Sequence, residues 1–113
     1  MALKEIATLP NFDRKFQLNP ECKPYTLRDN GFINTNTGKF LYKRDLNVET
    51  AQGLVLKVIV DKKIEKLRIS TVNQTGLSNI NVMKLDDNEM IIEKINFIFD
   101  GFIDRGVMIE IKD

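Results

Sequence analysis

The chain has 113 residues, of which 42% are hydrophobic and 29% are charged, and its formal net charge at pH 7 is +1. This length and composition indicate one globular domain spanning residues 1–113, and a total charge near zero is not typical of a nucleic-acid-binding protein or an acidic carrier. The absence of histidine and the single cysteine exclude a disulfide within the chain, remove the usual general base and argue against a zinc or iron site.

Residues 1–14 contain the charged Lys4 and Glu5 and no apolar run as long as that of a signal peptide. No stretch approaches the roughly 18 apolar residues that a membrane helix needs. We therefore expect a cytoplasmic protein without a cofactor or a metal. Because no catalytic motif is recognisable, we expect that it is not an enzyme, with an enzyme that works without histidine as an alternative.

The first third of the chain predicts little regular structure. Residues 2–9 are expected to form a short first strand, and residues 10–24 a long connection in which Phe12 and Phe16 reach the core. Residues 24–32, PYTLRDNGF, then predict a short helix with Thr26 as its N-cap. The following Asn-Gly pair would end this helix, and the alternative is a type I′ hairpin turn at the same pair.

From residue 32 the hydrophobic pattern has a period of two, which is typical of strands. Residues 32–35 and 39–44 predict one hairpin, and residues 54–60 and 66–72 predict a second. Phe40 and Tyr42 are expected to share the buried face. Two further strands are predicted, one over residues 80–85 and a last one over residues 107–111.

Residues 86–105 predict the long helix around which the rest of the chain is expected to pack. Asp86 and Glu89 have the spacing of a capping box. The apolar residues of this segment form one stripe at helical spacing: Ile91, Ile95, Ile98 and Phe102, widened by Ile92, Phe99 and Ile103. The predicted fold is α+β, a curved antiparallel sheet of about five to six strands with this C-terminal helix packed across one face.

The segment PYTLRDNGF, followed at residues 37–46 by TGKFLYKRDL, resembles a family of Gram-positive bacterial proteins. That family is a domain of unknown function that carries the label "putative amino acid metabolism". The resemblance covers essentially the whole chain and implies a fold similar to that of the TATA-binding protein. It also implies a link to cysteine and sulfur metabolism through neighbouring genes, but it supplies no catalytic residues.

The first candidate surface is the sheet face that points away from the long helix. By alternation this face is expected to present basic residues with apolar ones between them; the basic residues are Lys39, Lys43, Lys57, Lys66 and Arg68. Such a face could bind an acidic partner or a nucleic acid, although base-stacking aromatics are missing because Phe40 and Tyr42 point inward. An ordinary solvated face is the alternative, as is a homo-oligomer formed through Leu41, Val55 and Ile59.

Two smaller candidates lie near residue 25. Cys22 is expected in an accessible loop, where Lys23 would lower its thiol pKa and make it a reactive thiol, such as a persulfide acceptor; an unreactive cysteine is the alternative. Polar side chains on the short helix could line a pocket for a small zwitterion, with the arginine binding a carboxylate at two points, or could act only as caps and surface ion pairs. They are Tyr25, Arg28, Asp29 and Asn30.

These observations predict a cytoplasmic accessory protein that binds a ligand or a partner, with a role in amino-acid metabolism and with cysteine or sulfur metabolism as the candidate branch. The partner would be a protein of that metabolism. The alternative function is a nucleic-acid-binding module that uses the basic face of the sheet. No membrane partner is expected.

Overall fold

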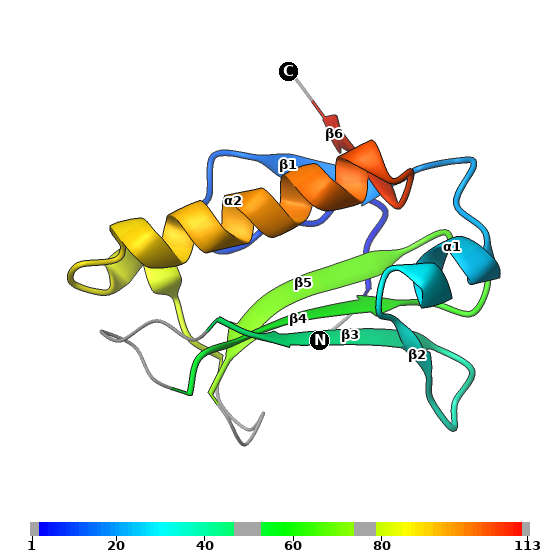
Figure 1. The fold of residues 1–113 in the computed structure, drawn as a ribbon, viewed down its shortest axis with the longest axis horizontal. Helices are drawn as coiled ribbons and strands as arrows, with labels where there is room; N and C mark the ends of the chain where they lie inside the picture. The colour runs from blue at the N-terminus through cyan, green and yellow to red at the C-terminus, as the bar shows by residue number, and fades with distance from the viewer. Residues whose placement is uncertain (1–2, 47–52, 74–78, 112–113) are drawn as a thin grey trace.

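The structure is a computed structural model that describes residues 3–46, 53–73 and 79–111. Figure 1 shows the arrangement of its elements in space. In chain order they are β1 (Lys15–Leu18), α1 (Pro24–Asp29), β2 (Ile33–Asn34), β3 (Phe40–Asp45), β4 (Val55–Val60), β5 (Leu67–Val72), the 3₁₀ turn η1 (Val82–Lys84), α2 (Glu89–Asp104) and β6 (Met108–Ile111).

The strands form two antiparallel sheets rather than one. Strands β2, β3, β4 and β5 make a four-stranded sheet in that order, and β1 pairs with β6 in a separate two-stranded sheet. Both predicted hairpins are confirmed, with Ile33 opposite Leu41 in the first and Leu56 opposite Thr71 in the second. The α+β class is therefore confirmed, whereas the six strands are divided between two sheets.

The first predicted strand is placed wrongly. Residues 3–9 make only isolated bridges, from Lys4 to Leu67 and from Ala7 to Phe16. The regular strand lies in the segment expected to be a connection, because Phe16 and Leu18 alternate there with outward-facing residues. As predicted, Phe12 and Phe16 belong to the core.

Helix α2 lies between the two sheets, and its apolar stripe is buried against both (Figure 1). The ring of Phe99 packs on Phe16 of β1 with a centroid distance of 4.6 Å. The ring of Phe102 packs on Tyr42 of β3 with a centroid distance of 5.0 Å. Since each such side chain contributes roughly 1.5–3 kcal/mol when it is fully buried, this double contact holds the two sheets together.

The start of α2 differs from the prediction. The helix begins at Glu89 with Asn88 as its N-cap residue, so the predicted capping box of Asp86 and Glu89 is wrong. Asp87 has a positive φ of 52°, which places a tight turn where the first helical residues were expected. The amide of Asn88 instead donates to the carbonyl of Val82 at 2.9 Å, and the strand predicted over residues 80–85 is replaced by η1.

The short helix predicted after Pro24 is confirmed as α1, and the alternative type I′ turn is not formed. The helix starts one residue after Lys23 rather than at Thr26. Thr26 lies inside the first turn, where its hydroxyl accepts a 3.2 Å hydrogen bond from the Lys23 amide. Gly31 follows with a φ of 92°, a conformation that glycine adopts without strain.

Candidate functional site

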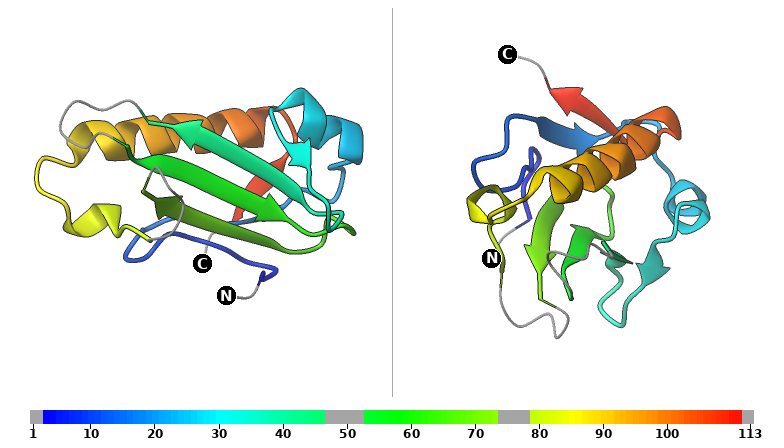
Figure 2. Two further views of the ribbon diagram at one scale, coloured as in Figure 1. Left: turned by 90° about the horizontal axis from the view of Figure 1, so that it is seen from below. Right: turned by 60° about the vertical axis from the view of Figure 1, so that its left-hand side comes forward.

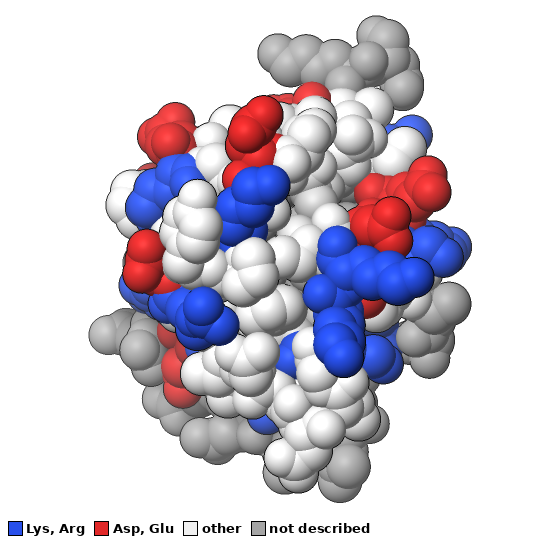
Figure 3. All heavy atoms as spheres, turned by 90° about the vertical axis from the view of Figure 1, so that its right-hand side faces the viewer, with Lys and Arg blue, Asp and Glu red and all other residues white. Residues whose placement is uncertain are grey.

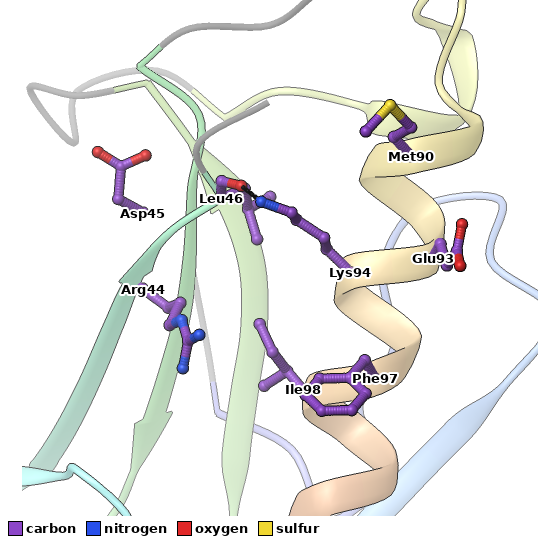
Figure 4. A pocket seen from close by; sticks show the side chains of 8 residues that line it. All are labelled: Arg44, Asp45, Leu46, Met90, Glu93, Lys94, Phe97 and Ile98. Atoms are coloured by element: carbon purple, nitrogen blue, oxygen red, sulfur yellow. Dashed lines mark hydrogen bonds between the residues drawn. The ribbon is translucent and has the colours of Figure 1, made fainter. Parts of the chain in front are cut away.

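A hollow that combines charged and apolar walls lies between the end of β3 and the first half of α2. Its volume is about 480 Å³, within the range of small-molecule sites, roughly 300–1,000 Å³. Figure 4 shows the cleft and its lining residues: Arg44, Asp45, Leu46, Met90, Glu93, Lys94, Phe97 and Ile98.

Arg44 points into this cleft because of its position in β3. It lies opposite Leu56 of β4, a fully buried residue of the helix-facing side. Arg44 therefore continues the inward row of Phe40 and Tyr42, but it comes at the end of the strand, where its side chain is exposed. Among the described residues the Arg44 guanidinium has no hydrogen-bond or ion-pair partner. The cleft thus holds a cation whose donors no described residue occupies.

The side chain of Lys94 reaches from α2 to the end of β3 (Figure 4). Its ammonium group donates a 2.7 Å hydrogen bond to the carbonyl of Leu46, which joins α2 to the end of β3 (Figure 4). Asp45 and Glu93 lie at the two rims, on the strand side and the helix side respectively. The cleft therefore carries both signs of charge, with the cations between the elements and the carboxylates at its edges.

The apolar part of the cleft is unusually open to solvent. Phe97 is 76% exposed and Met90 is 60% exposed, whereas Ile98 beside them is buried. Phe97 lies next to the buried stripe of α2 and faces the opening (Figure 4). An exposed aromatic ring beside a guanidinium suits a ligand that has an apolar portion and a carboxylate.

The residues predicted to form a zwitterion pocket lie elsewhere. Tyr25, Arg28, Asp29 and Asn30 belong to α1 or follow it, and Figure 1 places α1 beside the beginning of β3, at the other end from the cleft. The side chain of Asn30 is already hydrogen-bonded within the protein. Its amide donates to the Thr26 carbonyl at 2.8 Å, and its side-chain oxygen accepts from Nε of Arg105. These four residues do not line the cleft.

The expectation that Cys22 is accessible is wrong. Its side chain is only 5% exposed, because Cys22 is part of the hydrophobic core. Burial raises the pKa of the Cys22 thiol, and the positive charge of Lys23 lowers it by a smaller amount. The thiol environment is therefore opposite to the one expected for a reactive cysteine. Among the described residues, no group of three or more cysteines and carboxylates is placed to hold a metal ion.

The predicted basic residues do share the outer face of the four-stranded sheet. Lys43 lies directly opposite Lys57, and Arg68 lies opposite Ile59 in the next row. Lys39 and Lys66 precede β3 and β5 with the same alternation. At the end of the molecule formed by α1 and the β4–β5 turn, basic side chains instead form separate groups with acidic ones between them (Figure 3).

Comparison with known proteins agrees with this architecture. The family DUF1831, described as "Putative amino acid metabolism", matches residues 1–109. The chain belongs to this family. A crystal structure of a DUF1831 family protein from Lactobacillus plantarum is similar to it, with 26% sequence identity and a TM-score of 0.86 over 98% of this chain and 99% of that one. None of the curated proteins matches the chain. The family resemblance inferred from the sequence is thus confirmed, and within the described ranges this DUF1831 chain has no helix that could span a membrane.

Sequence reasoning did not single out Arg44, Lys94 or Phe97 as site residues. One signal was available, because Arg44 has the same alternation as Phe40 and Tyr42 and so had to be a cation on the inward side of a strand. For Phe97 the signal was an aromatic residue that falls outside the helical stripe.

Proposed function

We propose that this protein binds a small amino-acid-like zwitterion in the cleft between β3 and α2 and acts as a cytoplasmic accessory protein in amino-acid metabolism, not as an enzyme. The family description supports the metabolic class. The sequence supports a binding role, because it contains no histidine and only one cysteine, which is buried.

The observation that carries the proposal is the guanidinium of Arg44, which lies on the helix-facing side of the sheet and has no partner among the described residues. A guanidinium binds a carboxylate through two parallel hydrogen bonds, and this geometry is stronger and more specific than a single contact. Arg44 would hold the ligand carboxylate, and the carboxylates of Asp45 or Glu93 would attract its ammonium group. Phe97, Met90 and Ile98 would contact an apolar side chain.

The test is isothermal titration of the purified protein with a panel of amino acids that includes cysteine, methionine, leucine and phenylalanine. We expect heat with at least one apolar or sulfur-containing member. Arg44→Ala should weaken that binding by about tenfold to a hundredfold, because a hydrogen bond to a charged group contributes about 1.5–3 kcal/mol. No heat with any member would overturn the proposal.

Arg28→Ala is the matched control, because Arg28 is an exposed arginine on α1 outside the cleft. It should leave the affinity unchanged. If Arg28→Ala removed binding and Arg44→Ala did not, the site would instead be the polar surface of α1 that the sequence suggested.

A further inference from the structure

We propose that the outer face of the four-stranded sheet is a docking surface for an acidic amphipathic helix of a partner protein. The outer face is defined by the side chains that point away from α2 on β2 to β5 and at the strand ends; they are Ile33, Lys39, Leu41, Lys43, Asp45, Val55, Lys57, Ile59, Lys66, Arg68, Ser70 and Val72. This surface is separate from the cleft, so the inference goes beyond the proposed ligand.

The outer face is open. Seen from below, the four strands lie in front of α2, and no helix of the described chain covers them (Figure 2, left). Ile33 is 61% exposed, and Lys39, Lys43 and Lys66 are also exposed. An antiparallel sheet with one free face normally alternates apolar inward and polar outward residues. Here the outward positions include aliphatic side chains as well.

The residues of the outer face form ordered rows across the strands. One row begins with Ile33, Leu41 and Ile59, which face one another on β2, β3 and β4, and ends with Arg68 on β5. The next row, about 7 Å further along the strands, consists of Lys43 opposite Lys57. An aliphatic row beside a cationic row suits a partner with an apolar stripe flanked by carboxylates.

The cations of this face form no ion pair with the described residues, and they outnumber the carboxylate that the end of β3 adds to the face, that of Asp45. Lys43 and Lys57 make no ion pair within the described ranges, and neither does Arg68. The Asp61 carboxylate at one end already accepts hydrogen bonds from the amides of Glu65 and Lys66, at 2.7 Å and 3.0 Å. Two like charges placed directly opposite each other in a sheet, as Lys43 and Lys57 are, destabilise it. Arrangements that lower the stability of the fold in this way tend to occur at functional sites.

The chemistry of the face favours a helix over the other occupants. Binding to single-stranded nucleic acid relies on aromatic side chains that stack on bases, and the outer face has aliphatic side chains instead. Two copies of the chain packed outer face to outer face would bring Lys43 and Lys57 against lysines. An amphipathic helix presents apolar anchors on one side with acidic residues beside them, which matches both rows.

The test uses two synthetic peptides of about 20 residues, long enough to form a helix. Both have the same alanine, leucine and glutamate composition. One places leucines on a single helical face with glutamates beside them, and the other has a scrambled order. Fluorescence anisotropy should show binding of the patterned peptide, a decrease of affinity with added salt, and about tenfold weaker binding to Lys43→Glu/Lys57→Glu.

Lys62→Glu/Lys63→Glu is the matched control, because it makes the same charge change at the exposed β4–β5 turn. It should leave the affinity within about twofold, and circular dichroism should show that both double variants are folded. The proposal is overturned by equal binding of the scrambled peptide, by equal losses in the two double variants, or by no peptide binding. It is likewise overturned if a single-stranded oligonucleotide binds to this face and the patterned peptide does not, or if sedimentation shows a dimer that Lys43→Glu/Lys57→Glu dissociates.

Discussion

Arg14 donates a 2.9 Å hydrogen bond to the carboxylate of Glu110, and this ion pair joins the segment before β1 to β6. The same guanidinium also binds Asp100 and Asn96 of α2, each at 2.8 Å, and it lies 5.2 Å from the ring centre of Phe16. One partly buried side chain therefore fastens the two-stranded sheet to the long helix.

Arg14→Ala should lower the free energy of unfolding by about 1–3 kcal/mol, because three acceptors lose a charged donor and the ring of Phe16 loses the guanidinium above it. Urea unfolding measures this. Asp100→Asn is the control, because the Asp100 side chain is 60% exposed and an exposed ion pair contributes only about 0–1 kcal/mol. Equal losses in both variants would show that Arg14 acts only through the surface pair.

Phe99→Ala should be the most destabilising of the single changes considered, at about 3–5 kcal/mol. Phe99 is fully buried, and its ring contacts both Phe12 and Phe16, so its removal leaves a cavity between α2 and β1. Phe97→Ala, two residues away on the same helix, should change stability by no more than about 0.5 kcal/mol because its side chain faces solvent. Thermal unfolding of the two variants compares them directly, and similar melting temperatures would contradict the packing described.

Lys43→Glu should raise the free energy of unfolding by about 0.2–1 kcal/mol, because a carboxylate would then face Lys57 across β3 and β4. The gain should disappear in Lys43→Glu/Lys57→Glu, where two like charges again oppose each other, and it should shrink at high salt. A gain in the double variant as large as in the single one would show that the facing lysines do not repel.

Cys22 makes stability depend on pH in a defined direction. Its folded pKa is raised above its ordinary value, so the buried thiol contributes fully below about pH 8.5 and this contribution is lost as the pH rises through the folded pKa. Urea unfolding at neutral and alkaline pH should show a smaller alkaline loss in Cys22→Ala than in the parent chain. The folded parent should also react more slowly with iodoacetamide than the unfolded parent, and equal rates would contradict the burial of this thiol.

Local periodicity was enough to predict much of the fold. The stripe of α2 and the two hairpins are patterns within about 20 residues of sequence, and each is formed where it was expected. Periodicity does not predict which strands pair with each other. Phe16 is paired with Glu110 across almost the whole chain, so the division into two sheets could not be read from either segment alone.

The candidate cleft escaped prediction for a similar reason. Arg44 and Phe97 come from elements far apart in the sequence, and the hollow exists only where β3 extends beyond the core beside α2. The outer sheet face, by contrast, was predicted residue by residue, because alternation along a strand determines which side each residue faces. The capping errors have another cause. Asp86 and Thr26 have suitable side chains, but the tight turn at Asp87 and the proline at the first position of α1, Pro24, set where the helices begin.

The pairing of Lys15 with Ile111 in β1 and β6 has a consequence during synthesis on the ribosome. The four-stranded sheet can assemble as soon as residues 33–72 have emerged from the exit tunnel, since all its strands lie within that range. Strand β1 emerges earlier still, but it can pair with β6 only after the segment that contains Ile111 has followed. The nascent protein therefore passes through a stage in which all four strands of one sheet have emerged and the other sheet has only one of its two strands.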